Sequence, residues 1–317
     1  MSIIKRTIKN NRILSHLYYL IHKKIITFLY KFSPILTSKY QYKKRTGKNL
    51  NLKQPQNFNE KLQWLKLYWQ HPLVVQCTDK YEVRSYIENC GCKEILNQLY
   101  DVYENTSEIN WDSLPKKFVL KATHGCGFNI ICDDKKKFDK EDVFKNLDEW
   151  LHTDISIIAG ELHYAKIKPR IICEKYIESA SGYLPDDFKI YCFNGTAKLI
   201  LVCSDRSGNL KLNFLNLNWE KLNIGSELFN KGEIPKKPKC LQDLIKYSEK
   251  LSKPFPFVRV DFYIFNGRPI FGELTFTPAG CMASYYNEEG LQLLGDMLAL
   301  PERYNGQNDK KTNLSIS

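Results

Sequence analysis

Acidic residues are absent from the first 50 positions of this 317-residue chain. These positions carry twelve lysines and arginines, whereas the other 267 positions carry 35 basic and 35 acidic residues, so the whole net charge of +12 comes from the N-terminal segment. Nucleic-acid-binding proteins spread lysine and arginine over the binding domain itself. The neutral body therefore argues against nucleic acid as a partner.

A long apolar run is also missing. No run approaches the roughly 20 residues of a membrane span, and the N-terminal apolar stretch is interrupted by His22, Lys23 and Lys24. A secretory signal needs an unbroken apolar region, so we expect a cytoplasmic protein. None of the ten cysteines forms a C-x-x-C pair, which predicts small buried thiols rather than a disulfide framework or a zinc site.

Several nucleotide-binding and sugar-transfer motifs are missing as well. The chain lacks G-x-x-x-x-G-K-[ST], G-x-G-x-x-G, H-R-D and D-F-G, which argues against P-loop, dinucleotide-binding and protein-kinase folds. It also lacks D-x-D, the metal–diphosphate motif of many glycosyltransferases, although Asp186-Asp187 comes near.

The chain does contain short β-rich runs that alternate with loops and helical patterns. Strands are expected at residues 118–122, 129–133, 170–177, 188–193, 198–203, 257–265 and 269–276. Helices are expected at residues 58–67, 79–89, 140–152, 241–251 and 287–298. This mixture predicts an α+β (mixed α/β) fold, and the 43% hydrophobic content is sufficient for packed cores.

The basic N-terminal segment has its own pattern. Apolar residues recur at spacings of three and four from Leu14 to Phe32, which predicts an amphipathic helix that Pro34 ends. Its apolar stripe could pack on the body and leave a solvated basic face. It could equally lie in an anionic membrane surface, where each nearby lysine or arginine adds about 1 kcal/mol. The sequence leaves both placements open.

Two carboxylates are predicted to face each other on a β-hairpin. Strand alternation separates Arg259 and Asp261 from the apolar face of residues 257–265. A two-residue turn at Asn266-Gly267 would place Asp261 opposite Gly272. A three-residue loop that also includes Arg268 would place Asp261 opposite Glu273, and we expect this register. Facing carboxylates need a cation between them, either Mg²⁺ or a salt bridge from Arg259.

A second candidate site lies around residues 118–129. Lys121 ends a predicted strand and is followed by His124, Gly125, Cys126 and Gly127. Glycines let backbone N–H groups approach an anion, and Lys121 would supply charge. An ordinary hairpin turn fits the same residues. His124 could act as a base or cap backbone groups with its ring.

The order of the motifs resembles the ATP-grasp superfamily, and specifically its TupA-like branch, which is associated with teichuronopeptide and other bacterial surface-polysaccharide synthesis. The resemblance covers roughly residues 51–301. Its motifs are F-N-E-K-L at 58–62, T-D-K at 78–80, K-A-T-H-G at 121–125, E-K-Y-I at 174–177, D-F-K at 187–189, C-F-N-G at 192–195, D-R at 205–206, and residues 259–280.

The resemblance implies a nucleotide held between two α+β subdomains under a mobile glycine loop. The implied organisation is an extension (1–48), a pre-grasp region (49–115), a lid subdomain (116–177), a C-terminal subdomain with the metal site (178–301) and a tail (302–317). ATP and Mg²⁺ would be the cofactors.

The resemblance also implies roles for individual residues. Lys80 and Lys121 would neutralise phosphates, with Gly125 and Gly127 in the loop over them. Glu174, Lys175 and Ile177 would belong to the adenine hinge, with Lys189 also at the nucleotide, and Asp187 would contact the ribose or the substrate. Arg259 would steady the transferred phosphoryl group, and the metal ligands would be Asp261, Glu273 and Thr275.

Two positions depart from the usual pattern. Most ATP-grasp ligases have Asn where this chain has Thr275, and the branch commonly has Ser where this chain has Cys126. A hydroxyl can still supply an oxygen ligand, whereas a thiol is a weaker hydrogen-bond partner.

The implied activity is ATP-dependent ligation. A substrate carboxylate would form an acyl phosphate that an amine opens to an amide, with positioning and electrostatics carrying the phosphoryl transfer. The expected partners are a sugar acid or glycan and an amine or amino acid, and the segment 1–48 could contact an anionic membrane at its cytoplasmic face. The alternatives are a glycosyltransferase of polysaccharide synthesis and a non-catalytic nucleotide-binding scaffold.

Overall fold

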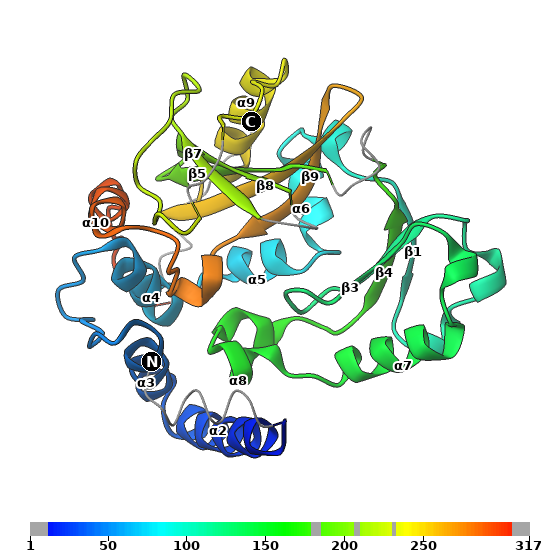
Figure 1. Cartoon of the computed structure of the whole chain (residues 1–317), viewed down its shortest axis with the longest axis horizontal. Helices are drawn as coiled ribbons and strands as arrows, with labels where there is room; N and C mark the ends of the chain where they lie inside the picture. Colours follow the sequence, from blue (N-terminus) through cyan, green and yellow to red (C-terminus); the bar gives the residue numbers. More distant parts are fainter. Residues whose placement is uncertain (1–11, 179–184, 206–209, 230–232, 306–317) are drawn as a thin grey trace.

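The computed structural model of the chain describes residues 12–178, 185–205, 210–229 and 233–305. The first eleven residues of the basic extension, Arg206 and the tail beyond residue 305 lie outside these ranges. Within them the fold is α+β, as predicted, with two separate antiparallel sheets (Figure 1).

The smaller sheet has four strands in the order β1-β4-β2-β3. These are β1 (Leu99–Tyr103), β2 (Phe118–Ala122), β3 (Asn129–Cys132) and β4 (Ile171–Lys175). The larger sheet has the order β7-β6-β5-β8-β9. Its strands are β5 (Asp187–Phe193), β6 (Thr196–Ser204), β7 (Lys211–Leu215), β8 (Phe257–Phe265) and β9 (Arg268–Thr275).

The helices pack against the faces of the two sheets. They are α2 (Arg12–Phe32), α3 (Pro34–Thr46), α4 (Phe58–Tyr68), α5 (Pro72–Thr78), α6 (Val83–Asn89), α7 (Lys140–Leu151), α8 (Ile155–Ala159), α9 (Leu241–Ser252) and α10 (Glu288–Met297). Short 3₁₀ turns are η1 (Lys93–Ile95), η2 (Thr106–Glu108), η3 (Trp111–Ser113), η4 (Lys135–Lys137), η5 (Leu162–Lys166) and η6 (Pro278–Cys281).

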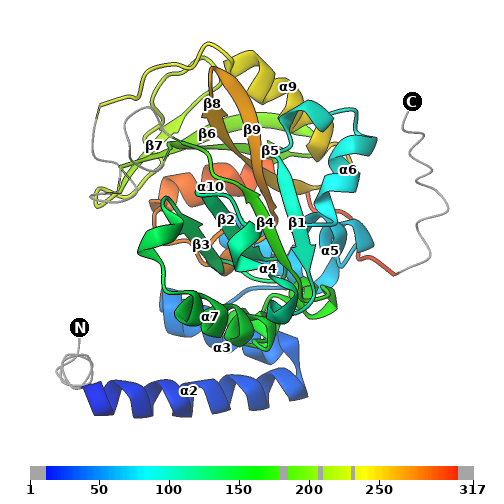
Figure 2. The same ribbon diagram turned by 90° about the vertical axis from the view of Figure 1, so that its right-hand side faces the viewer.

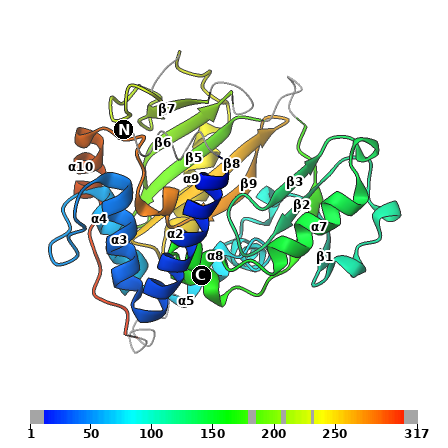
Figure 3. The same ribbon diagram turned by 60° about the horizontal axis from the view of Figure 1, so that its bottom comes forward.

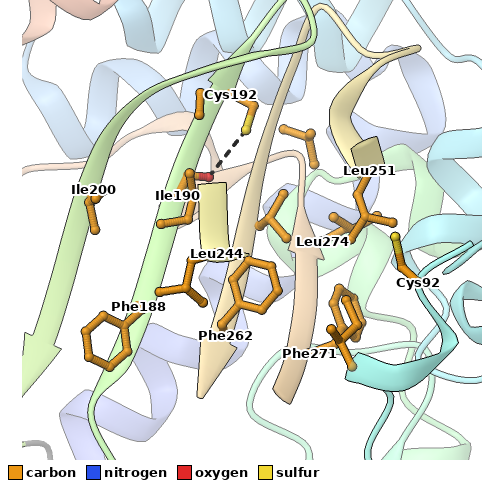
Figure 4. Packing of buried hydrophobic residues seen from close by; sticks show 14 of the residues in the cluster. Cys92, Phe188, Ile190, Cys192, Ile200, Leu244, Leu251, Phe262, Phe271 and Leu274 are labelled. Carbon is orange, nitrogen blue, oxygen red and sulfur yellow. Dashed lines mark hydrogen bonds between the residues drawn. The ribbon is translucent and has the colours of Figure 1, made fainter. Parts of the chain in front are cut away.

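Three hydrophobic clusters hold these elements together. One face of the larger sheet packs on α9, where Leu244 and Leu251 meet Phe262 and Leu274 (Figure 4). The opposite face packs on α4 and α10, with Phe58 at its centre. The smaller sheet packs on α7. Helices therefore cover both faces of the larger sheet and one face of the smaller sheet.

All seven predicted strands are present, and the structure adds two that the sequence patterns did not reveal. β7 is an edge strand of the larger sheet and pairs with β6. β1 pairs with β4 through Tyr103 and Ile171, so the smaller sheet begins before residue 116, where the lid subdomain was expected to start. Short edge strands with little alternation give weak sequence signals.

The β8–β9 hairpin confirms the predicted pairing but corrects the predicted loop. Asp261 lies opposite Glu273, as expected. However, Phe265 pairs with Arg268, so the turn has two residues, Asn266 and Gly267. Both have positive φ, +50° and +75°, as the tight turn requires. A register shift next to Asp261 compensates, with one additional residue on β9.

The additional residue is Gly272. It also changes which β9 side chains share a face. Strict alternation along β9 would place Phe271 on the same face as Glu273, but Phe271 is buried in the same cluster as Phe262 and Leu274. A Cβ at Gly272 would lie 3.0 Å from the Asp261 carbonyl oxygen, so the close approach of β8 and β9 favours glycine here.

The N-terminal helix forms as predicted, and Pro34 starts the next helix. Helix α2 packs against α3 and α8 (Figures 2 and 3). Ile26 is buried on that side, and the Tyr30 hydroxyl donates a hydrogen bond to Ser156 Oγ. Much of the predicted apolar stripe faces outward instead, with Ile21, Ile25, Phe28 and Phe32 all exposed.

No helix in the described ranges is long and apolar enough to cross a membrane. The ten cysteines are all free thiols, and eight of them are buried. The prediction of small buried thiols is therefore confirmed, with Cys126 as an exposed exception.

Candidate active site

The two sheets bring four of the predicted residues, Lys80, Lys121, Glu174 and Glu273, to one cavity. Lys121 of β2 and Glu174 of β4 line it from the smaller sheet, and Glu273 of β9 lines it from the larger sheet. Lys80 joins them from the turn between α5 and α6. We call this space the intersheet cavity.

Arg259 and Asp261 are buried residues of β8. Asp261 pairs with Glu273, which lines the cavity. Arg259 Nε donates to Asp261 Oδ1 at 2.7 Å, and a second guanidinium nitrogen donates to Asp261 Oδ2 at 2.6 Å. Burial lowers the pKa of Arg259, but the Asp261 carboxylate outweighs it, and the pKa is raised. The predicted alternative, a salt bridge from Arg259, is therefore present in the structure.

Lys189 of β5 binds the other side of Asp261. Its Nζ lies 2.6 Å from Asp261 Oδ2 and 2.6 Å from Asp187 Oδ2. Burial lowers the pKa of Lys189, but Asp261 more than offsets it, so the pKa is raised and the side chain stays cationic. Asp187 therefore lies at the start of β5 as part of this ion-pair network.

Glu273 is the most accessible carboxylate of the hairpin. Its side chain is 46% exposed, and its Oε1 accepts a 2.9 Å hydrogen bond from the Thr275 hydroxyl. Arg259 lies 3.7 Å away and also donates to Thr275 Oγ1 at 3.1 Å. Burial raises the pKa of Glu273, but Lys189, Arg259 and Lys80 outweigh it, and the pKa is lowered.

This oxygen-rich set fits Mg²⁺. In the described ranges no group of three or more His, Cys, Asp or Glu residues forms a metal cluster. Magnesium commonly uses only one or two carboxylates and completes its octahedron with water and substrate phosphates. Glu273, Thr275 and Asp261 supply such oxygens, although Asp261 would have to share its carboxylate with Arg259 and Lys189.

On the smaller sheet, Lys121 pairs with Glu174. Its Nζ lies 2.7 Å from Glu174 Oε2, and the other oxygen lies 3.2 Å from Arg84. Burial lowers the pKa of Lys121, but Glu174 outweighs it and the net pKa is raised. Lys121 is therefore a fixed positive charge in the cavity wall.

Lys80 is held in place by its neighbour Asp79. Asp79 Oδ1 accepts from the Tyr81 backbone at 2.8 Å, and Oδ2 accepts from Arg170 at 3.0 Å. Lys80 Nζ donates to the carbonyl oxygen of Gly125. Burial and the nearby Lys121 lower the pKa of Lys80, with Glu273 opposing them.

The loop after β2 is packed rather than open. Phe128 stacks on Trp150 with ring centroids 5.2 Å apart and an interplanar angle of 4°. A Cβ on Gly125 would meet the Phe128 ring at 2.4 Å, while Gly127 has φ of +76°. His124 Nε2 lies 2.9 Å from the Trp150 carbonyl oxygen, which agrees with the capping interpretation of this histidine.

The predicted hinge lies at the end of β4. The Lys175 backbone N–H donates to the Gln98 carbonyl at 2.9 Å, and its own carbonyl accepts from Asn97 at 2.8 Å. Ile177 follows two residues later and is half-buried. A hinge contact through Lys175 would compete with these bonds, whereas Ile177 lies beyond the strand.

Sequence reasoning missed the supporting arginines. Arg84 and Arg170 come from a helix and a loop without a recognisable motif, and only the fold brings them to Glu174 and Asp79. The sequence offers one signal for Arg84, which lies only four positions after Lys80 in the Asp79-Lys80 motif.

The TupA-like ATP-grasp family model matches residues 60–299. The chain belongs to this family. Its members are part of the ATP-grasp superfamily, whose enzymes use ATP with Mg²⁺. None of the curated proteins compared with the chain matches it.

Solved structures show more distant similarity. The ATP complex of D-alanine–D-alanine ligase from Bacillus anthracis is 16% identical with a TM-score of 0.42, over 70% of this chain and 65% of that one. An L-amino acid ligase from Bacillus licheniformis is 16% identical with a TM-score of 0.43, over 73% and 53%. The ATP-grasp ligase PsnB with minimal precursor, Mg and ADP is 12% identical with a TM-score of 0.39, over 75% and 64%. The chain thus spans less than two thirds of these proteins.

Proposed function

We propose that this protein is an ATP-dependent carboxylate–amine ligase that acts through an acyl phosphate. The observation that carries the proposal is the intersheet cavity, which Lys80, Lys121 of the smaller sheet and Glu273 of the larger sheet line together. Cations on one side and an oxygen-rich metal site on the other are the two elements that bind and polarise a nucleoside triphosphate.

The residues have separate roles in this proposal. Lys80 and Lys121 neutralise phosphate oxygens, and the loop with Gly125 and Gly127 covers them. Arg259 steadies the transferred phosphoryl group. Asp261, Glu273 and Thr275 hold Mg²⁺, which neutralises charge on the phosphates when bound.

The nucleoside end lies toward β4 and β5. Ile177 contacts adenine through its backbone, with Glu174 and Lys175 shaping the hinge. Asp187 contacts the ribose or the substrate, and Lys189 offsets the repulsion between Asp187 and Asp261, because its ammonium lies between them. In this proposal residues 116–177 form the lid subdomain, β1 joins its sheet, and residues 178–301 carry the metal site.

The proposed substrates are a sugar acid of a bacterial surface glycan and an amine or amino acid. The TupA-like branch is associated with such polysaccharides, which supports this choice. Products of this kind are made at the cytoplasmic face of the inner membrane, where the exposed apolar residues of α2 and the basic residues around them would contact anionic lipid.

The direct test measures ADP and phosphate release from Mg-ATP with panels of uronic acids and amino acids. We expect release only when both a carboxylate and an amine are present, and mass spectrometry should detect the amide. Asp261→Asn should reduce turnover to near background. Sugar transfer from a nucleotide sugar without ATP would replace this proposal with a glycosyltransferase. A thermal shift with millimolar Mg-ATP but no ADP release with any substrate pair would indicate a non-catalytic nucleotide-binding scaffold.

A further inference from the structure

The segment that follows β9 contains a strained backbone turn. Ala279, Gly280 and Cys281 have φ of +52°, +63° and +61°, and we call these three residues the left-handed turn. Two of them carry a Cβ atom, for which the left-handed region is unfavourable. In the described ranges the other residues with positive φ occur singly or in Asn-Gly hairpin turns. Such strain persists only where the surroundings hold it, and it often marks a functional site.

The left-handed turn lies directly beyond the proposed metal ligands. Thr275 is the last residue of β9 and the last to pair with β8, opposite Arg259. β9 lies at the opposite edge of the larger sheet from β7, so β8 is its one neighbour in the sheet. The direction in which the chain leaves Thr275 is therefore set by the turn four residues later rather than by strand pairing.

Side chains of α4 hold the backbone of this turn and of the residues after it. Gln63 Nε2 donates to the carbonyl oxygens of Gly280 and Cys281 at 3.3 and 3.4 Å. Asn59 Nδ2 donates to the Ala283 carbonyl oxygen at 3.1 Å, and Asn59 Oδ1 accepts from the Ala283 N–H at 3.3 Å. Both amide side chains therefore use their hydrogen bonds on one short segment of backbone.

Arg45 completes this set of contacts. It lies near the end of α3, and its Nε donates to the Met282 carbonyl oxygen at 3.2 Å. Carbonyl groups of four consecutive residues, 280–283, thus accept from side chains at least 217 positions away. We call Arg45, Asn59 and Gln63 the carbonyl clamp.

Burial makes the two amides of the clamp firm supports. Asn59 and Gln63 are 2% and 0% exposed, so water cannot replace either donor, and a lost bond would leave a buried carbonyl group unpaired. Asn59 belongs to the F-N-E-K-L motif at 58–62. The nucleotide and metal chemistry described above gives this motif no role.

We propose that Asn59 and Gln63, with Arg45, are positioning residues that hold the left-handed turn against its own strain and thereby fix Thr275 and Glu273 for Mg²⁺. The inference rests on the proposed magnesium site and adds residues that do not line it. Without the clamp, the residues of the turn that carry a Cβ atom relax toward negative φ, and the end of β9 shifts with them. Supports outside the ligand set typically contribute about 10–100-fold to metal affinity.

The test measures how much Mg²⁺ strengthens ADP binding. Calorimetry of the full-length protein gives the dissociation constant of ADP with Mg²⁺ and with EDTA, and we call the ratio of the two the magnesium gain. Gln63→Met should lower the magnesium gain about tenfold, because Met fills the same space and loses both hydrogen bonds. Its affinity for metal-free ADP should remain that of the wild type, whereas general damage would weaken both.

A second substitution separates strain from damage to α4. Ala279 is exposed, and glycine adopts positive φ without the cost of a Cβ atom. Adding Ala279→Gly to Gln63→Met should restore most of the magnesium gain, because the turn then needs less support. Removing an exposed methyl group cannot repair the packing of α4, so a double variant that stays as weak as Gln63→Met would overturn the proposal.

Lys61→Met is the matched control on the same helix. Lys61 Nζ donates to the carbonyl oxygens of Gly295 and Leu298 at 2.8 and 2.9 Å. The control therefore also removes two bonds from α4 to backbone carbonyls, but these belong to the end of α10. It should lower the midpoint of thermal unfolding and keep the magnesium gain. A loss of gain equal to that of Gln63→Met would overturn the proposal.

Arg45→Met keeps the test decisive if Gln63→Met does not fold. Its side chain is exposed, so the fold should survive, and loss of the Met282 bond should lower the magnesium gain about twofold or more. An undiminished gain in Gln63→Met, or in Arg45→Met where that protein alone folds, would overturn the positioning role.

Hydrogen exchange without nucleotide keeps this inference separate from the proposed function. Residues 279–283 should exchange faster in Gln63→Met than in the wild type, and unchanged exchange would show that the clamp does not hold the turn. If the wild type itself has no magnesium gain, the proposed magnesium site fails and the positioning role fails with it, while the exchange data still decide whether the clamp holds the turn.

Discussion

Asp261 and Glu273 lie directly opposite each other on β8 and β9, although the turn that joins the strands has only two residues. Without compensation, that turn would place Gly272 opposite Asp261 and direct Glu273 into the core. The bulge at Gly272 absorbs one residue and turns Glu273 toward the intersheet cavity. The proposed metal site therefore depends on the backbone at Gly272.

We predict that Gly272→Ala lowers activity by more than its effect on stability would suggest. The added methyl group would lie 3.0 Å from the Asp261 carbonyl oxygen, so the strands must shift at an expected cost of about 1–2 kcal/mol. The shift would move Glu273 away from Asp261. Thermal denaturation together with Mg-ATP titration measures both effects.

Gly267→Ala is the matched control. Gly267 has φ of +75° with open space around it, so alanine should cost about 1 kcal/mol through backbone strain alone. It lies at the far end of the same hairpin, and its Mg-ATP affinity should remain that of the wild type. If Gly272→Ala and Gly267→Ala lose Mg-ATP affinity equally, the bulge at Gly272 has no specific role in positioning Glu273.

The apolar patterns of the sequence predicted most of the fold. Alternation in residues 257–265 identified Val258, Val260 and Phe262 as core residues, and all three are fully buried. Local periodicity succeeds here because the strand is long and one face is entirely apolar. Apolar periodicity does not reveal a β-bulge. The predicted pairing of Asp261 with Glu273 was therefore correct, although it was derived from a three-residue loop that the structure does not have.

Other features depend on contacts between distant segments. Lys80 and Glu273 are 193 positions apart, and only the fold brings them to one cavity. Likewise, the spacing in α2 predicted an apolar stripe but not its direction. The stripe faces outward because Ile26 and Tyr30, on the other side of the helix, make the contacts with the body.

Lys121→Met should lower the rate of ATP-dependent ligation about 100-fold, the usual effect of removing one positioned charge from a phosphoryl-transfer site. The fold should survive, since Glu174 keeps its contact with Arg84 at 3.2 Å. Lys117→Met removes a surface lysine from the loop before the same strand, whose partner Glu178 is exposed. It should retain full activity, and a comparable loss there would indicate a nonspecific charge effect.

The affinity for Mg-ATP should fall as the pH rises, and this fall should occur at a pH below the usual lysine pKa of 10.5. Burial and the neighbouring Lys121 lower the pKa of Lys80 from its usual 10.5. Lys80 is charged below its lowered pKa and loses its proton as pH rises through it, so phosphate binding weakens there. The dissociation constant of Mg-ATP, measured by calorimetry across alkaline pH, should rise at a lower pH than an unperturbed lysine would cause.

Lys80→Arg provides the control for that profile. Arginine keeps its charge throughout the range, so the alkaline weakening attributed to Lys80 should disappear or move upward. For the wild type, the folded state binds fewer protons than the unfolded state between the two pKa values, and the free energy of unfolding should rise with pH in that window. An identical affinity profile in both proteins would assign the titration to another group.

The outward stripe of α2 predicts binding to anionic vesicles. Phe28 and Phe32 are 62% and 74% exposed, so replacing both with serine should change stability little. If they insert into lipid, the double variant should lose about 3 kcal/mol of membrane affinity or more. Sedimentation with phosphatidylglycerol vesicles measures the loss.

The charge contribution should be separable from the apolar one. Lys24 and Lys31 are exposed on α2, and Lys24→Gln with Lys31→Gln should weaken binding by about 2 kcal/mol at low salt and by less at high salt. Leu228→Ser removes an equally exposed apolar side chain from another part of the surface and should bind like the wild type. If the Phe28→Ser, Phe32→Ser protein binds like the wild type, the stripe does not insert into lipid. If the Lys24→Gln, Lys31→Gln protein also binds like the wild type, these two lysines have no role in membrane binding.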